Sequence, residues 1–366
     1  MERPLSTHLC EIPEFRRQNK NFKHLLSDVL LMSICAVFHG AEDFYEIEDF
    51  CREREGFLRT FLTLPNGIPT HDTINRIFCA LDSKLFNEKF MAWLQDLLAE
   101  LDLEKDIKHI CIDGKTLRGA KSKLHLIHAV SSELGLCLGQ VKTDEKSNEI
   151  TAIPHLLDTL HLKGCIVSLD AMGTQKDIAE KIREKEGDYF LALKGNQKEL
   201  FEQVKQQFSV EKADEVYTKV DYSGSHNAVT SYQVSVCHDL KWIENATEWK
   251  DLYSLACVKS VSDKRGEVSR YYISSIPNLT AKQAYELARG HWSVENKLHW
   301  QLDVTLREDS KRNRKEFSAE NFSLLRKIVL NIAQIHEPKL SKKRIIKKMM
   351  WNQDYCLLML AKIIAK

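Results

Sequence analysis

The hydrophobic pattern of this chain changes its period near residue 107, and this change constrains the fold more than any other feature. Before it, residues 22–100 carry apolar side chains at helical spacing, interrupted by the turn LPNGIP, with Thr70 and Asp72 as candidate helix N-caps. After it come three short β-rich runs, IKHICIDGKTL, KLHLIHAVSS and LCLGQVKTD. The pattern predicts a helical N-terminal domain followed by an antiparallel meander of three strands.

Beyond the meander, predicted helices and strands alternate. The helical patterns NEITAIPHLLDTLHL, TQKDIAEKIREKE and NQKELFEQVKQQF are separated by the strand patterns CIVSLDAM and DYFLALK, which favours a mixed α/β sheet with helical crossovers. Residues 209–275 are β-rich again, with strand candidates TSYQVSVC, YSLACVKSVS and RYYISSI. A helix then begins near Thr280, and SAENFSLLRKIVLNIAQI predicts another amphipathic helix.

Composition places the chain among ordinary globular proteins. Of its 366 residues 43% are hydrophobic and 29% are charged, and no apolar run reaches the roughly 20 residues of a membrane helix. Neither a membrane span nor a signal-peptide core is recognisable, so we expect a cytoplasmic protein. The ten cysteines are scattered without a CxxC pair, which favours reduced, buried thiols over disulfides or zinc.

Two aspartates stand at the ends of apolar strand patterns. Asp113 follows ICI and precedes a glycine, and Asp170 follows IVSL. A carboxylate in such a place is costly unless it is paired, hydrogen-bonded or bound to metal. Turn or helix-cap roles remain alternatives, and for Asp170 the cap role competes with Thr174. Two such acids on neighbouring strands of one sheet are more suggestive than either alone.

A third acid, Glu295, lies in the helical stretch RGHWSVENKLHWQLDV. At 3.6 residues per turn, positions four apart drift by about 40°, which puts Glu295 at the edge of the apolar stripe, between His291 and His299. A histidine zinc site is a less favoured alternative, because the HExxH spacing is absent. We expect Trp292 and Trp300 to be packing residues. Two alternatives stay open for Asp303: it extends this acidic edge, or it is a solvated side chain.

Together the three acids favour a site for hard divalent cations. Carboxylate oxygens suit Mg²⁺ or Mn²⁺, and two such ions can hold the attacking and leaving oxygens of a phosphodiester displacement. The order meander, helix, strand, helix and late acidic helix is the one that an RNase H-like fold requires. These observations point toward phosphodiester chemistry without establishing it.

The chain resembles the H-repeat-associated DDE transposases of bacterial insertion sequences over nearly its whole length. The motifs that carry the resemblance are LSDVLLMSICAVFHGAEDFYEIEDF, NGIPTHDTINRI, IDGKTLRG, GQVKTDEKSNEITAIPHLL, DAMGTQKDIAEKI, DYFLALKGNQ, RYYISS and HWSVENKLHWQLDV. The resemblance implies that Asp113, Asp170 and Glu295 are the catalytic acids and that they bind two Mg²⁺ or Mn²⁺ ions. It also implies double-stranded DNA as the partner, at transposon ends and target, and a homodimer on DNA.

The same resemblance divides the chain into three parts. Residues 1–103 form an N-terminal helical domain, which either binds the DNA ends or serves only as a scaffold. Residues 104–335 form an RNase H-like catalytic domain with a β-rich insertion at about 209–275, and residues 336–366 form a basic helical tail. Supporting roles around the acids fall to His291, His299, Lys115, Lys194, Asn196 and Lys297.

The predicted DNA contacts come partly from a charge asymmetry. Residues 311–350 hold twelve Lys and Arg against three Asp and Glu, a net charge of +9, and such a segment meets phosphates or is only a solvated helix face. The candidate contacts are Arg118, His226, Lys342, Lys343, Arg344, Lys347 and Lys348. Relatives place two arginines where this chain has Ala228 and Tyr232, which weakens expected contacts to a DNA end. A nuclease without strand transfer and a decayed DNA-binding copy therefore remain alternatives to a transposase.

Overall fold

The computed structural model of the chain describes residues 3–17, 22–117, 124–143, 149–210, 213–222, 229–263, 266–310, 316–361 and 363–364. Its first hundred residues are helical, as predicted. The helices are α1 (Leu5–Cys10), α2 (Leu26–Phe38), α3 (Phe44–Glu53), α4 (Glu55–Leu58), α5 (His71–Ala80) and α6 (Ser83–Glu100), followed by the 3-10 turn η1 (Glu104–Asp106).

Helix capping in this region differs in part from the prediction. Thr70 is at the N-cap position of α5, but its side chain makes no capping hydrogen bond, and Asp72 lies inside the first turn. The aspartates that cap helices here are Asp43, whose carboxylate accepts from Glu46 N, and Asp82, which accepts from Lys84 N and Leu85 N. Both follow the rule that a short acidic side chain satisfies free amide groups in the first turn.

Nine strands form one mixed sheet in the order β3-β2-β1-β4-β5-β9-β8-β7-β6. Their bounds are β1 (His109–Leu117), β2 (Leu124–Ser131), β3 (Cys137–Thr143), β4 (Ile166–Leu169), β5 (Asp188–Leu193), β6 (Glu215–Asp221), β7 (Thr230–Cys237), β8 (Ser254–Ser262) and β9 (Gly266–Ser274). β1 to β3 pair as the antiparallel meander, and β4 and β5 continue from β1 in parallel. This arrangement confirms the mixed α/β fold of the RNase H-like type.

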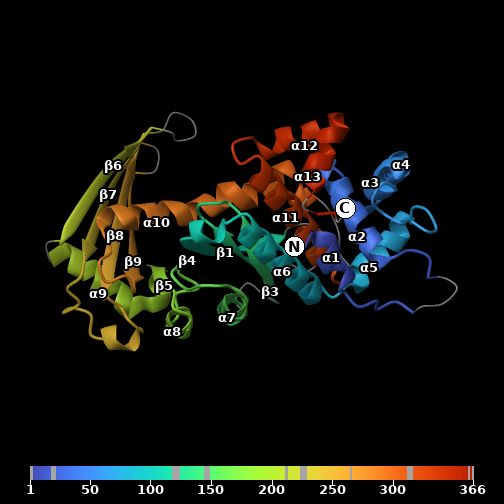
Figure 1. Cartoon of the computed structure of the whole chain (residues 1–366). Helices are drawn as coiled ribbons and strands as arrows, with labels where there is room; N and C mark the ends of the chain where they lie inside the picture. Colours follow the sequence, from blue (N-terminus) through green and yellow to red (C-terminus); the bar gives the residue numbers. More distant parts are fainter. Residues whose placement is uncertain are drawn as a thin grey trace.

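The β-rich segment extends this same sheet. β9 pairs antiparallel with β5, and β8, β7 and β6 follow outward (Figure 1). The sequence predicted β7, β8 and most of β9, but it did not predict β6. The residues of β6 are largely exposed, so the strand lacks the buried, alternating apolar residues by which a strand is recognised in a sequence.

The remaining helices cover the sheet and close the core. They are α7 (Glu149–Thr159), α8 (Lys176–Glu184), α9 (Lys198–Val210), α10 (Ala281–Val294), α11 (Ser318–His336), α12 (Lys342–Trp351) and α13 (Gln353–Leu360), with 3-10 turns η3 (Gly195–Gln197), η4 (Ala246–Glu248) and η7 (Glu308–Ser310). α10 crosses one face of the sheet and packs on strands from β6 and β7 to β1 (Figure 1). No helix in the described part of the chain is long and apolar enough to span a membrane.

The hydrophobic core is continuous from the N-terminal helices to the last ones. α11 packs against α2, α5 and α6, and it is buried along most of its length. Ile345 and Met349 of α12 and Met359 of α13 lie in the same core as α2 and β1. The division of the chain at residues 103 and 335 stays a prediction, and the core does not stop at either boundary.

α10 lies close to the sheet at Gly290. A Cβ atom at this position would lie 2.5 Å from Ser132 Oγ and 2.8 Å from His109 Nδ1. His109 is buried and its Nε2 is hydrogen-bonded to Ser168, so the ring cannot simply retreat. Because glycine within a helix is disfavoured relative to alanine, its presence here is explained by the need for this close contact.

We therefore expect Gly290→Ala to destabilise the protein by about 1–3 kcal/mol, the usual cost of overpacking, because α10 must move away from β1. The measurement is the urea unfolding midpoint, with Gly56→Ala as the control. A Cβ at Gly56 meets nothing within 4 Å, so that variant should be neutral or slightly more stable. If Gly290→Ala is as stable as Gly56→Ala, the contact with His109 is not tight.

Candidate active site

Asp113 and Asp170 lie side by side on two parallel strands. Ile112 of β1 is in register with Leu169 of β4, so the aspartates that follow are at the same level of the sheet. Asp170 Oδ1 accepts hydrogen bonds from Met172 N (3.0 Å) and Gly173 N (3.3 Å). One carboxylate oxygen of Asp170 therefore has the turn role that the sequence left open, and the turn does not use Oδ2. The N-cap residue of α8 is Gln175, so neither Asp170 nor Thr174 caps this helix.

Glu295 marks a change in the winding of its helix. α10 ends at Val294, and two π-helical turns follow, η5 (Glu295–His299) and η6 (Gln301–Thr305). His299, one turn after Glu295, is buried, with only 4% of its surface exposed. The i→i+5 bonds of a π-helix turn each residue through a smaller angle, which brings His299 back over the sheet, and such turns are frequent at functional sites.

His299 joins Glu295 to Asp113. Its Nδ1 is 3.1 Å from Glu295 Oε2 and 3.8 Å from Asp113 Oδ2. Because both distances end on the same nitrogen, the two carboxylate oxygens are at most about 7 Å apart. The Glu295 side chain is 70% exposed, so it lies at the open side of the site.

A buried histidine lies behind this contact. His128 of β2 is the strand partner of Asp113, and its ring packs edge-on against His299 at a centroid distance of 5.5 Å. Burial lowers the pKa of His128 well below the ordinary value, so this imidazole stays neutral at physiological pH. The residue that packs against His299 on the sheet side is therefore the neutral ring of His128.

The donor chemistry of the three acids fits a hard cation, but their side chains do not form a closed ligand set. Within the described ranges, no group of three or more His, Cys, Asp or Glu side chains has the arrangement of a metal site. Asp113 and Asp170 supply carboxylates from adjacent strands, and Glu295 is within reach of Asp113. Carboxylate oxygens are the ligands that Mg²⁺ and Mn²⁺ prefer. Convergence of all three acids on the same ions stays a prediction.

His291 lies on the aspartate side of the site. Its Nδ1 is 2.9 Å from Ser168 Oγ, and burial lowers its pKa against the opposing charges of Asp113 and Asp170. His299 is the histidine in contact with Glu295, so an orienting role for His291 toward Glu295 is less well supported than a role near the two aspartates. Its contact with phosphate stays a prediction.

Two of the other predicted supporting residues make hydrogen bonds to the backbone, and one is an exposed cation. Lys297 Nζ donates to Ser132 O, and Asn196 Nδ2 donates to Ala171 O, directly after Asp170. Lys194 is exposed just beyond the end of β5. Asn196 thus fixes the loop that carries Asp170, and Lys194 remains available to a phosphate.

Lys115 is withdrawn from the open site. Its ammonium is buried, 2.7 Å from Asp303, 3.0 Å from Glu308 and 3.4 Å from Asp309. Although burial opposes the charge, Glu308 and Asp303 raise the pKa of Lys115. Asp303 accordingly belongs to a buried ion-pair cluster. The position of Lys115 two residues after Asp113 suggested a supporting role, and nothing in the local sequence indicated the three acids that enclose it.

The predicted DNA contacts are only partly accessible. Arg118, His226 and Ala228 lie outside the described residues. The helix predicted over the basic run is present as α12, but Lys342 is buried, with Nζ 3.4 Å from Ala333 O, and burial lowers its pKa to about 8. Lys348 is half-buried and paired with Glu337 at 3.2 Å. The exposed cations of the run are Lys343, Arg344 and Lys347.

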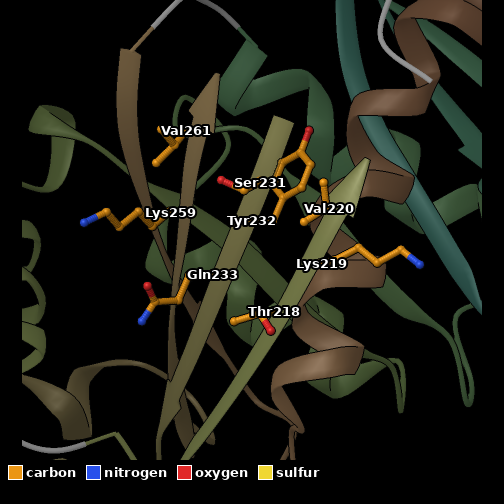
Figure 2. Close-up of a pocket in the computed structure, with 8 residues that line it drawn as sticks. All are labelled: Thr218, Lys219, Val220, Ser231, Tyr232, Gln233, Lys259 and Val261. Atoms are coloured by element: carbon orange, nitrogen blue, oxygen red, sulfur yellow. The ribbon is translucent and has the colours of Figure 1, made fainter. Parts of the chain in front are cut away.

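Tyr232 contacts Arg289 of α10. Arg289 donates from one guanidinium nitrogen to Tyr232 Oη (3.2 Å), and another lies 3.3 Å from an Asp221 carboxylate oxygen. Tyr232 and Lys219 point to the α10 side of the outer strands, while Gln233 and Lys259 point to the other (Figure 2). These residues line a hollow of about 240 Å³ on β6 to β8. A guanidinium from the helix therefore lies beside Tyr232, one of the two positions at which the resemblance implied an arginine.

The two tryptophans beside Glu295 have different surroundings. Trp292 packs as expected and has the Arg270 guanidinium 4.5 Å and the Arg289 guanidinium 5.9 Å from its ring centroid. Trp300 was expected to pack too, and this was wrong, because 48% of it is exposed. The π-helical turn that buries His299 leaves the next residue facing solvent.

Family models and curated relatives both indicate one family for this chain. A model described as "Transposase DDE domain" matches residues 104–332, and a model described as "DDE_Tnp_1-associated" matches residues 6–94. The H repeat-associated putative transposase YhhI of Escherichia coli (strain K12) is 41% identical over 90% of this chain and 89% of its own. The putative transposase YncI of Escherichia coli O157:H7 is 40% identical over 96% and 93%. A solved piggyBac transposase synaptic complex with hairpin DNA aligns with 98% of this chain and 77% of its own, at 12% identity and a TM-score of 0.39.

Proposed function

The chain belongs to the transposase DDE domain family, and on that premise we propose that it hydrolyses DNA phosphodiester bonds at the ends of a mobile element and joins the freed 3′-hydroxyl to a target. The observation that supports this most directly is the pair Asp113 and Asp170 on adjacent parallel strands, with Glu295 linked to Asp113 through His299. On this proposal the three carboxylates act together as one site.

In the proposed reaction Asp113, Asp170 and Glu295 would hold two Mg²⁺ or Mn²⁺ ions. Such ions stabilise charge on the attacking and leaving oxygens. The chain's own residues position these acids: Asn196 ties the loop after Asp170, and His299 holds Glu295 beside Asp113. His291 and Lys194 are placed to contact phosphate oxygens, since each is near the aspartate edge.

The test is Mn²⁺-dependent cleavage of plasmid DNA, followed by a strand-transfer assay on pre-cut ends. Cleavage with transfer supports the transposase, and cleavage without transfer supports a nuclease. Absence of cleavage under conditions where the protein still binds DNA supports a decayed copy. Arg289 beside Tyr232 weakens the argument for decay, because a guanidinium remains in that region.

We further propose that the exposed face of α12 binds DNA phosphates. The five-residue contact expected from the sequence is reduced to Lys343, Arg344 and Lys347, since Lys342 is buried and Lys348 is paired. Removing one cation that neutralises a phosphate lowers the log–log salt slope of binding by about 0.9. Replacing all three with Gln should therefore flatten the slope by up to about 2.7 for every duplex sequence.

The control for the α12 triple variant replaces three exposed lysines from other surfaces, Lys105, Lys163 and Lys241. Both variants remove three positive charges, but only the α12 variant should change the slope by this amount. Equal slopes in the two variants would mean that α12 is only a solvated helix face, and the DNA contact would then be assigned to the N-terminal helices.

A homodimer on DNA, acting in the cytoplasm at the bacterial nucleoid, completes the proposal. Joining two element ends requires two active sites held together. Light scattering of the protein with and without an end-containing duplex measures this directly. A complex with one protein copy per duplex at all concentrations would contradict it.

A further inference from the structure

Three polar side chains form a continuous hydrogen-bonded path beneath the acid site. His109 Nε2 is 2.7 Å from Ser168 Oγ, and the same oxygen is 2.9 Å from His291 Nδ1. The residues come from β1, β4 and α10, respectively. Ser168 lies in β4, two residues before Asp170, which directly follows this strand. The path therefore connects the protein interior to the histidine at the catalytic edge.

The number of hydrogens on these side chains leaves two arrangements of donors and acceptors along the path. Burial lowers the pKa of His109 to about 3, so this ring is neutral and one of its nitrogens carries a hydrogen. A serine hydroxyl donates one hydrogen bond and can accept others. Cys111 Sγ also lies 3.5 Å from His109 Nε2 and contacts Ser168, but a thiol is the weaker partner, so Ser168 donates to one histidine and accepts from the other. Either it donates to His291 Nδ1 and leaves the hydrogen of a neutral His291 on Nε2, or it accepts from Nδ1 and leaves Nε2 as a lone pair.

The charges around His291 decide between these arrangements. Asp113 and Asp170 are the charged groups that act most strongly on this ring. Since Nδ1 is bonded to Ser168, Nε2 is the nitrogen left for the aspartate edge. A lone pair on a neutral ring would be repelled by carboxylates, whereas an N–H would be attracted to carboxylate, water or phosphate oxygens. The favourable arrangement has His109 donating to Ser168 and Ser168 donating to His291.

We propose that Ser168 is a positioning residue that fixes His291 as the Nε2–H tautomer, so that the ring presents a hydrogen-bond donor to phosphate at the acid site. The use of this donor rests on the proposed function. The tautomer itself does not, because it follows from hydrogen bonds within the protein. Around metal ligands, removing the hydrogen-bond partner that orients a ring typically costs 10–100-fold in activity or metal affinity, and we expect the lower end of this range for His291, whose role is to contact phosphate.

The decisive experiment is ¹⁵N NMR of histidine-labelled protein at neutral pH without metal or DNA, with the His291 signals assigned by their absence in His291→Gln. We expect a protonated Nε2 and an unprotonated Nδ1 in the parent protein. In Ser168→Ala the two nitrogens should shift toward a tautomer mixture. The control is Ser274→Ala, which removes an equally buried strand hydroxyl bonded to Tyr189 O and should leave the His291 signals unchanged.

Kinetics provide a second readout that loss of a buried hydroxyl alone would not give. Ser168→Ala should lower kcat for Mn²⁺-dependent cleavage by about 10-fold with little change in KM for DNA, and Ser274→Ala should match the parent. If Ser168→Ala does not fold, the tautomer of His291 in the parent protein still tests the proposal. A parent ring protonated at Nδ1 overturns the inference whatever the activity. A parent with the expected tautomer and no cleavage contradicts the proposed function and leaves the assignment of the tautomer intact.

Discussion

Asp113→Asn should abolish Mn²⁺-dependent DNA cleavage while leaving the fold unchanged. The substitution keeps the shape of the side chain, and an amide oxygen can still accept the hydrogen bond from Gly114 N that Asp113 Oδ1 accepts at 2.9 Å. What it removes is the negative charge that a divalent ion would need. We expect a loss of about 10²–10³-fold, the scale of removing a group that stabilises charge in a transition state.

The measurements are the cleavage rate with Mn²⁺, the thermal unfolding midpoint and DNA affinity without metal. Asp170→Asn should behave in the same way, because its turn with Met172 N and Gly173 N needs only an oxygen acceptor. The matched control is Asp72→Asn, an exposed aspartate in α5, which should cleave at the parental rate. Parental activity in Asp113→Asn, or equal losses in all three variants, would exclude a specific role for these acids.

Much of the fold was predictable because its elements have simple periods. The meander, the crossover helices and the strands before Asp170 and Lys194 all combine short apolar runs with clear turn residues. The aspartates could be selected because a carboxylate at the end of a buried strand is unusual. Prediction failed for β6, whose exposed residues show no buried face.

The local winding near Glu295 could not be read from periodicity. An angular projection assumes one turn angle throughout, and the π-helical turns begin at Glu295 itself. Trp300 was therefore expected to pack, whereas the structure leaves it 48% exposed and buries the preceding His299. Contacts between distant segments were also hidden. Ser168 has no unusual local sequence, and its importance appears only when His109 and His291 meet it.

The basic segment shows how charge counts can mislead. Arg326 and Lys327 contribute to the +9 of residues 311–350, yet both are buried in α11, where Lys327 Nζ donates to Ser323 Oγ at 2.6 Å. Ser323 in turn donates to Glu308 at 2.6 Å. These two cations act in the core, next to Lys115, and they are not part of a DNA-binding surface. Composition records a charge but not which way its side chain points.

Lys115→Met should be the most destabilising single substitution in this buried cluster. It leaves Asp303, Glu308 and Asp309 without the ammonium that they share within 3.4 Å. Removing one partner of a buried ion pair costs about 3–5 kcal/mol, because an uncompensated charge remains. We expect the urea midpoint to fall accordingly at pH 7. An unchanged midpoint would mean that water solvates these acids in place of Lys115.

Glu308→Gln tests whether the cost in Lys115→Met comes from the stranded charge. In the parent, burial opposes ionisation, but Lys327 and Lys115 lower the pKa of Glu308, so its contribution is present above the unfolded pKa and is lost as pH falls through the folded one. Without Lys115 the folded pKa rises, and protonation relieves the penalty. The stability gap between Lys115→Met and the parent should therefore narrow as pH falls from 7 toward 4. The double variant Lys115→Met/Glu308→Gln should lose less stability than the two single variants lose together, because neutral Gln leaves no buried charge at position 308. Strict additivity would indicate that Lys115 stabilises the fold through its packing and not through its charge.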